Sequence, residues 1–478
     1  MSVTETRRPE DAAPTPQPAC FCPLDETTAG VPAPLRGSLL VRVGSRVLQA
    51  ACFVYGAVLL YWVWLAKGMA LAFFLRDPVF YGYSILVSLY VLSRFALAPF
   101  YRATPDTGHR PSCSVIIPAF NEEDAVAATV DAIYASDYPE GKLQVVVVDD
   151  GSTDGTWREI LRLRERHPSL LAVQFSHNRG KRAAMAEGIR RSTAEILIFV
   201  DSDSVIEADG IARIVPDFAD PRVGSVVGQA DVLNKTESWL TRMQQVRYYC
   251  AFRVNKGAES LFGAVTCASG CFSAYRRTAL LPVLPAWERQ RFLGRNATFG
   301  DDRALTNYVL RDWRVVFQSG ARSHTIAPTT LRRFLVQQLR WKKSWLRESL
   351  HVGRFIWRKH PLAAAATYLG VLFPWVAPLV VVHSVLYRTI GTGSPLFYVM
   401  GAYVMALLYS LTYAISRRSP LWWHGLTFVA VYMAFLVWQT YYAVATLRNT
   451  AWGTRASLHR EDAGEVRVLA PLAEGGTA

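Results

Sequence analysis

The chain has 478 residues, about half of them apolar, and a formal net charge of +14 at pH 7. This length accommodates one globular domain of about 200 residues together with several membrane-spanning segments. The basic excess suits anionic lipid or an anionic substrate, and because the sequence contains no helix-turn-helix, zinc-finger or RNA-recognition pattern, we expect no nucleic-acid partner.

The N-terminal region predicts a cytosolic tail followed by two transmembrane helices. The first 35 residues are rich in Pro, Thr and Glu and lack the apolar core of a signal peptide, so residues 1–48 are predicted to be disordered. Apolar stretches at 49–67 and 79–100 approach spanning length and define a membrane region at 49–101. Arginines before the first stretch place the N-terminus in the cytosol. Seven scattered cysteines without paired zinc-ligand spacing favour reduced thiols facing the cytosol.

Residues 102–330 alternate between strand and helix patterns. Continuous apolar strands in β-α-β-α order predict an α/β, Rossmann-like domain with a mixed, mostly parallel sheet covered on both faces. In such sheets ligands bind beyond the carboxyl ends of the strands. The predicted strands are 114–118, 143–149, 172–175 and 195–200, and the predicted helices are 121–135 and 156–167.

The C-terminal part predicts a return to the membrane. Residues 331–360 mix Trp, Phe and Leu with Arg and Lys, which is typical of amphipathic helices on a membrane surface. Three apolar stretches near 362–387, 395–415 and 421–446 lie within a channel-forming region at 361–447. Three full crossings would place the C-terminal tail outside the cell, but the Arg residues after the second and third stretches favour a cytosolic position. We therefore expect one of the three stretches to be re-entrant or broken, with the last as the first candidate. Residues 448–478 are expected to be a loop and a loose polar tail, and the whole protein to be a multi-pass plasma-membrane protein with a cytosolic globular domain.

A pair of carboxylates follows the last predicted strand. Asp201 and Asp203, separated by Ser202, are placed to share a divalent cation, Mg²⁺ or Mn²⁺, with a diphosphate. Taken alone, the same tripeptide is also compatible with a solvated turn or a helix cap.

Other polar groups at strand ends are candidates for nucleotide binding. Acidic and amide side chains there are suited to uracil and ribose, and Lys181 opens a helix that suits a phosphate. Turn chemistry and a solvated basic loop are the plainer interpretations. The candidate residues are Ala119, Asn121, Glu122, Asp149, Asp150 and Lys181.

Two later motifs supply a candidate base and a candidate sugar platform. Asp302, beside Asp301 and Arg303, is suited to deprotonate an acceptor hydroxyl, although the same carboxylates also suit the cap of the helix that follows. In the run from Gln337 to Trp341, Arg340 is suited to pyrophosphate and Trp341 to stacking on a sugar ring. Interfacial anchoring of the helix is the alternative for this run. Cys267 is expected to be a small packing residue that lines a sugar site.

In this order the motifs resemble the processive family-2 glycosyltransferases, which include cellulose, chitin and hyaluronan synthases. The sequence resembles hyaluronan synthases in particular, and the segments that carry this resemblance are 231–238, 246–252, 262–270 and 299–307. The resemblance implies a GT-A domain that binds UDP-sugar donors with Mg²⁺ or Mn²⁺, a growing polysaccharide and a lipid bilayer. It implies that Asp149, Asp150 and Lys181 hold the nucleotide, that Asp201 and Asp203 approach the metal, and that Asp302 is the base. The residues expected to contact the acceptor are Cys267, Asp301, Arg303, Gln337 and Trp341. Those expected to form a gating loop are Trp452, Gly453, Thr454 and Arg455.

Three departures from the family pattern bear on the product. Ala304 stands where hyaluronan synthases and rhizobial chitooligosaccharide synthases usually have His. Cys271 begins a segment that differs from the usual Pro-Leu-Gly, and the Trp452–Arg455 motif is shorter than usual. The resemblance predicts a hyaluronan synthase that uses UDP-GlcNAc and UDP-GlcA. The departures at Ala304 and Cys271 leave a chitin-like synthase using UDP-GlcNAc alone as the alternative. A transferase that adds one sugar to a lipid carrier and a transporter with a decayed nucleotide-binding domain are weaker alternatives. The sequence carries no signal for an oligomeric state.

Overall fold

The computed structural model describes residues 54, 61, 78–386, 394–448 and 465–472. The predicted tail at 1–48, most of the first apolar stretch and the Trp452–Arg455 motif lie outside these residues. Structural statements below refer to the described residues.

A nine-stranded mixed sheet forms the centre of the globular domain, with the order β11-β3-β2-β1-β4-β7-β6-β10-β5. The pairs β3–β2, β2–β1, β1–β4 and β6–β10 are parallel, whereas β7, β5 and β11 pair antiparallel with their neighbours. This confirms the predicted mixed α/β sheet. The strands are β1 (Cys113–Ala119), β2 (Leu143–Asp149), β3 (Leu171–Phe175), β4 (Ile196–Phe199), β5 (Ser204–Ile206), β6 (Val223–Val232), β7 (Ser273–Arg276), β10 (Arg314–Thr325) and β11 (Val466–Leu469), and a separate hairpin joins β8 (Arg291–Phe292) to β9 (Arg295–Asn296).

Apolar side chains on both faces of the sheet explain why its central strands are continuous hydrophobic runs. In β1, Val115 and Ile117 pack in one buried cluster with α4 and α5, while Ile116 packs on the opposite face with α6. Successive residues of a strand point to opposite faces, so a strand covered on both faces has no polar positions to alternate with. The helices of the domain are α4 (Val126–Tyr134), α5 (Thr156–Arg166), α6 (Lys181–Arg191), α7 (Gly210–Ile214), α8 (Trp239–Cys250), a π-helix η4 (Ala251–Lys256), α9 (Gly257–Ser260), α10 (Arg277–Leu280), α11 (Leu284–Glu288) and α12 (Asp301–Leu310).

Some boundaries and strands differ from the predictions. The helix expected from residue 121 begins at Val126, because Asn121 has a left-handed backbone with φ 54° and residues 121–125 form a turn. The sequence analysis did not identify β6 and β10. In β6, Gly224 and Gly228 weaken the strand pattern, and both are needed because Trp313 and Phe272 side chains lie within 3 Å of where a Cβ would stand.

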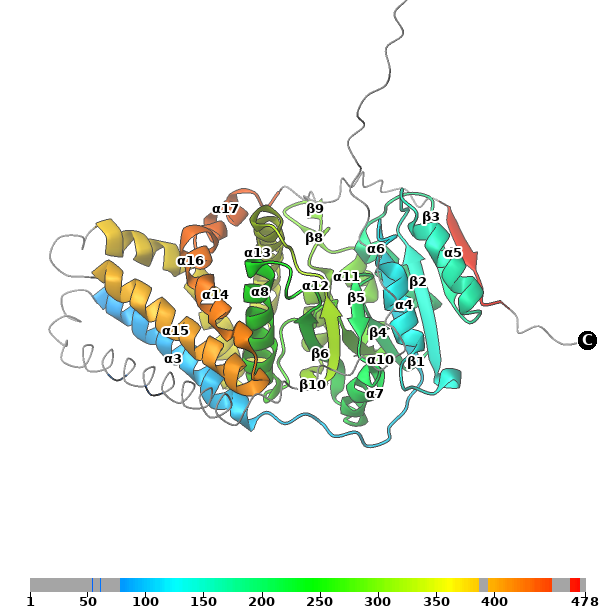
Figure 1. Cartoon of the computed structure of the whole chain (residues 1–478), viewed down its shortest axis with the longest axis horizontal. Coiled ribbons are helices and arrows are strands. Elements are labelled where there is room, and N and C mark those ends of the chain that lie inside the picture. The colour runs from blue at the N-terminus through cyan, green and yellow to red at the C-terminus, as the bar shows by residue number, and fades with distance from the viewer. Residues whose placement is uncertain (1–53, 55–60, 62–77, 387–393, 449–464, 473–478) are drawn as a thin grey trace, which may run out of the picture. The chain divides into compact units, whose positions relative to one another are not determined.

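Four described helical segments are long and apolar enough to cross a membrane: 81–100, 361–383, 399–417 and 420–445. They belong to α3 (Pro78–Leu97), α14 (Pro361–Leu386), α15 (Ser394–Arg417) and a last segment built from α16 (His424–Val431), a π-helix η7 (Tyr432–Leu436) and α17 (Gln439–Ala445). Helix α14 packs against α3 and α15, and α15 packs against α16 (Figure 1). The amphipathic segment forms one long helix, α13 (Leu331–Gly353), which contacts α12 and α17.

The C-terminal segment is not loose throughout. β11 (red in Figure 1) pairs antiparallel with β3 from Val466↔Phe175 to Leu469↔Ala172 and closes that edge of the sheet. The prediction of a loose tail is therefore wrong for these residues, because Val466 and Val468 pack beside a buried cluster that includes Val173 and Phe175.

Candidate active site

The polar motifs converge at the carboxyl ends of β1, β2 and β4. Ala119, the last residue of β1, is in register with Asp149 of β2, and Ile116 of β1 is in register with Phe199 of β4. Asp150 follows β2 directly, and Asp201 lies two residues beyond the end of β4. Parallel pairing thus brings together motifs that are about 80 residues apart in the sequence.

The two acidic residues after β2 organise the surrounding loops. Asp149, which is fully buried, accepts hydrogen bonds from the Ser152 backbone N–H at 3.1 Å and the Gln174 side chain at 3.3 Å. Asp150 accepts from the backbone N–H groups of Arg179 at 2.7 Å and Gly180 at 2.9 Å, immediately before α6. Burial raises the pKa of Asp150 to about 7, against the opposing effect of these hydrogen bonds.

The loop after β1 is tied to the loop after β2. Asn121 accepts a hydrogen bond from the Thr153 backbone N–H at 2.9 Å through its side-chain oxygen, and its own N–H donates to the Ser152 hydroxyl at 3.0 Å. The Glu122 N–H donates to the Thr156 hydroxyl at 2.8 Å. These contacts fix two loops of the predicted nucleotide site against each other.

The Asp201–Asp203 pair lies beside a half-buried cation. Lys181, the first residue of α6, forms a salt bridge with the Asp201 carboxylate. Gly270 lets this carboxylate approach its backbone, since a Cβ there would stand 2.8 Å from Asp201 Oδ1. Burial, together with the nearby charges of Asp201 and Asp203, raises the pKa of the neighbouring Cys271 thiol to about 12.

The two carboxylates fit a divalent cation that is shared with a diphosphate. Within the described ranges, no third His, Cys, Asp or Glu joins them in a metal-binding cluster. Mg²⁺ and similar cations commonly bind one or two carboxylates and take their remaining oxygen ligands from substrate phosphates and water. Asp201 and Asp203 suit that arrangement, which needs no closed protein cage.

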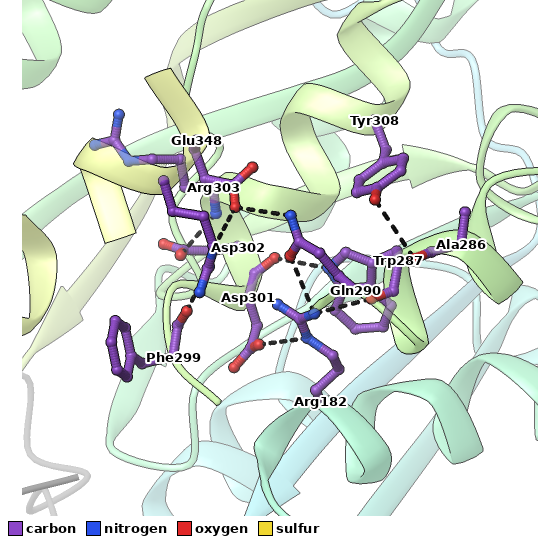
Figure 2. Close-up of polar contacts among 11 residues, drawn as sticks. Arg182, Ala286, Trp287, Gln290, Phe299, Asp301, Asp302, Arg303, Tyr308 and Glu348 are labelled. Carbon is purple, nitrogen blue, oxygen red and sulfur yellow. Dashed lines mark hydrogen bonds and ion pairs between the residues drawn. The ribbon is translucent and has the colours of Figure 1, made fainter. Parts of the chain in front are cut away.

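Asp302 and Asp301, adjacent in sequence, have different surroundings at the start of α12. Asp302 Oδ2 lies 3.9 Å from the Cys267 Sγ, and Oδ1 accepts the Arg303 N–H at 2.7 Å. Asp301 is 4% exposed and forms a salt bridge with Arg182 at 2.8 Å (Figure 2). The burial of Asp301 favours a supporting contact over the predicted contact with an acceptor.

A cavity of about 350 Å³ lies beside Cys267 and Arg303. It extends between the start of α12, η4, α13 and the apolar helices α3 and α14, so it leads from beside the candidate base to two helices that are long and apolar enough to cross a membrane. Its charged lining residues are Arg94, Lys256, Glu259, Arg303 and Glu348. Ala304 does not line it, because Ala304 is fully buried in the apolar core.

The predicted platform lies on α13. The Trp341 side chain is 44% exposed and its ring lies 6.2 Å from that of Tyr248. Gln337 is adjacent to Gln338, whose side-chain oxygen accepts a hydrogen bond from Arg247 at 2.9 Å. Arg340 lies on the same helix, one residue before Trp341. Burial raises the pKa of Tyr248, and the charges of Cys271 and Asp203 act in the same direction.

Several residues of the site were not singled out by the sequence analysis. Lys256, Glu259 and Glu348 line the cavity, and Arg182 forms a salt bridge with Asp301, the residue before Asp302. Only Arg182 had a sequence signal, as the neighbour of Lys181 in a basic loop. The others are single charged residues in helices whose orientation depends on tertiary packing.

Comparisons with known proteins bear on this geometry. The family model described as Glycosyl transferase family 2 matches residues 114–283 of this chain. An N-acetylglucosaminyltransferase from Azorhizobium caulinodans is 33% identical over 354 residues, covering 73% of this chain and 88% of that protein. A hyaluronan synthase from Streptococcus pyogenes is 29% identical over 390 residues, covering 78% and 90%. A mannosyltransferase from Pyrobaculum calidifontis, solved with GDP-Man and Mn²⁺, has a TM-score of 0.53 and 23% identity over 75% of this chain and 99% of that one, a likeness of fold.

Proposed function

Since the chain belongs to glycosyltransferase family 2, we propose that it is a processive, inverting polysaccharide synthase of the plasma membrane. In this proposal it polymerises hyaluronan from UDP-GlcNAc and UDP-GlcA and passes the polymer through the membrane helices. The catalytic domain would be cytosolic. The alternative is a chitin-like synthase that uses UDP-GlcNAc alone, which the identity to an N-acetylglucosaminyltransferase supports.

The proposed transfer step assigns a role to each side of the site. Asp149, Asp150, Asn121, Glu122 and Ala119 would surround the nucleotide, with Lys181 and Arg340 at the diphosphate. Asp201 and Asp203 would hold Mg²⁺ or Mn²⁺, which when bound neutralises charge on the departing UDP.

On the acceptor side, Asp302 would act as the base. An acceptor hydroxyl oxygen attacks C1 of the donor sugar, the bond from C1 to UDP breaks, and the hydroxyl proton passes to the Asp302 carboxylate. The inverted configuration follows from attack opposite the leaving group. Cys267, Arg303, Gln337 and Trp341 would contact the acceptor, and the proposed gating loop at Trp452–Arg455 lies outside the described residues.

The charge of the cavity is the observation that favours an anionic product. Of its two acids, Glu348 is hydrogen-bonded by Arg347 at 2.6 Å, and Glu259 faces Arg94. Lys256 and Arg303 have no carboxylate within salt-bridge distance among the described residues, and Lys256 lies 3.7 Å from the centroid of the Phe252 ring. Asp302 and Glu259 act on both Lys256 and Arg303, but the cavity lining carries three cations against two acids. This cationic excess suits a polymer with a carboxylate on every second sugar, whereas chitin carries no such charge.

Donor dependence tests this proposal. Membranes containing the protein are incubated with labelled UDP-GlcNAc alone, UDP-GlcA alone, or both, and the product is sized and digested with hyaluronidase or chitinase. We expect high-molecular-weight, hyaluronidase-sensitive polymer only with both donors. Polymer from UDP-GlcNAc alone would exclude hyaluronan and support the chitin-like alternative, and a single-sugar lipid product would exclude polymer synthesis.

The role of the cavity cations is tested separately. Lys256→Met should lower the polymerisation rate with both donors about tenfold, which corresponds to about 1.4 kcal/mol. Lys235→Met, which removes an exposed lysine, is the control. Equal rates in the two variants would mean that Lys256 does not contact the polymer.

A further inference from the structure

A buried network connects the two halves of the candidate site. Arg182, the second residue of α6, is 7% exposed. Its Nε donates to Asp301 Oδ1 at 2.8 Å, and its Nη1 donates to the Trp287 carbonyl at 2.9 Å and the Gln290 side-chain oxygen at 3.1 Å (Figure 2). The guanidinium carbon also lies 5.0 Å from the centroid of the Trp287 ring. One side chain thus joins α6 to α11 and to the first turn of α12.

The same network continues from Gln290 to α13. Gln290 donates to Glu348 Oε1 at 3.0 Å, and Arg347 donates to the same oxygen at 2.6 Å and to the Phe299 carbonyl at 2.7 Å. Phe299 precedes Gly300, the N-cap of α12. The start of α12 is therefore held from both sides by buried arginines.

Neighbouring residues on α6 reach different parts of the site. Lys181 pairs with Asp201 on the donor side, whereas Arg182 pairs with Asp301, one residue before the candidate base. Adjacent helix residues point about 100° apart, so one rigid turn can hold both groups at a fixed separation. Asp150 fixes this turn in place by accepting the N–H groups of Arg179 and Gly180.

We propose that Arg182 and Asp301 are positioning residues, which set the place of the Asp302 carboxylate relative to the donor diphosphate. This inference rests on the proposed role of Asp302. It assigns Asp301 to the support of the base, which its burial allows, in place of contact with the acceptor. Arginine suits the position because its planar fork reaches a carboxylate and two carbonyl oxygens at once, which a lysine ammonium does not reproduce.

The test compares Arg182→Lys and Asp301→Asn with Arg191→Lys. Arg191 lies on the same helix and forms an exposed salt bridge with Glu187 at 2.9 Å, so its substitution controls for the loss of a guanidinium. Each protein is purified in lipid nanodiscs, and kcat, KM for each donor, and the stoichiometry and Kd of UDP binding with Mn²⁺ are measured. We expect kcat to fall by about tenfold to a hundredfold in the first two variants, with UDP Kd and stoichiometry within about twofold of the unchanged protein, and no effect of Arg191→Lys.

The double variant separates positioning from a general loss of stability. If Arg182 acts through Asp301, combining Arg182→Lys with Asp301→Asn should lower kcat no further than the more damaging single change. Independent effects that multiply, or a UDP Kd that weakens in proportion to kcat, would overturn the proposal. If Arg182→Lys fails to accumulate, Asp301→Asn alone decides, since full activity in that variant contradicts the inference.

Asp302→Asn distinguishes this inference from the proposed function. If Asp302→Asn still transfers sugar, Asp302 is not the base, and the positioning inference is refuted together with that assignment. An inactive Asp302→Asn together with a fully active Arg182→Lys would refute only the positioning role and leave the base in place.

Discussion

Gly300→Ala is predicted to damage catalysis through geometry alone. Gly300 has φ 73°, and a Cβ there would stand 1.7 Å from Ser344 Oγ and 2.4 Å from Ser344 Cβ. Rotation of the hydroxyl relieves the first contact, but the second still requires a shift of about 0.6 Å to reach the 3.0 Å that real Cβ atoms tolerate. The left-handed backbone adds about 1–2 kcal/mol for a non-glycine residue, and the overpacking adds about 1–3 kcal/mol.

Because Asp302 follows two residues later, this shift is passed to the candidate base. A displacement of about 1 Å can lower a rate by about a hundredfold, so we expect Gly300→Ala to lower kcat by about tenfold or more. The assay is UDP release with saturating donors, together with thermal unfolding in detergent. Gly294→Ala is the matched control, since Gly294 has φ 81° but nothing within 4 Å of its Cβ position, and it should lower stability without changing kcat.

A second substitution should rescue the defect. Ser344→Gly removes both contacting atoms, so the Gly300→Ala/Ser344→Gly protein should recover much of its kcat while keeping the backbone strain. Wild-type kcat in Gly300→Ala, or no recovery in the double variant, would show that the contact with Ser344 does not position the base.

Three further predictions concern the fold and the donor side. Burial raises the pKa of Asp150 to about 7, whereas the unfolded chain has a pKa of about 3.9 there. Between these values the folded protein holds a proton that the unfolded chain releases, so stability should decrease as pH rises from 4 through 7. Asp150→Asn should flatten this decrease, as measured by thermal midpoints between pH 5 and pH 8. A variant that ends at residue 464 loses β11 and exposes the β3 edge, so its unfolding free energy should fall by about 2–4 kcal/mol for two half-buried valines and their neighbours, and an unchanged midpoint would mean that the pairing is not stable. Chelation with EDTA should abolish transfer, and Mn²⁺ or Mg²⁺ should restore it in the unchanged protein but not in an Asp201→Asn/Asp203→Asn variant; activity that survives chelation would exclude a metal at the carboxylate pair.

The sequence by itself determined the central strands and the candidate carboxylates. Strands buried on both faces need unbroken apolar runs, so LQVVVVD at 143–149 and EILIFV at 195–200 predicted β2 and β4 closely. Parallel strands place their carboxyl ends at one edge, and this rule predicted that Asp149 and Asp201 lie near each other. The search for unbroken apolar runs failed for β6, because two glycines that accommodate Trp313 and Phe272 interrupt its apolar pattern.

Tertiary structure decided what sequence spacing leaves open. The segment VRVL at 466–469 is too short to form a strand alone, and it becomes β11 only because β3 offers an unpaired edge with apolar neighbours. Asp301 and Asp302 are chemically identical neighbours, and adjacent positions on a helix face different directions. Packing against Arg182 and Trp287 decides that Asp301 is buried and that Asp302 lies beside Cys267.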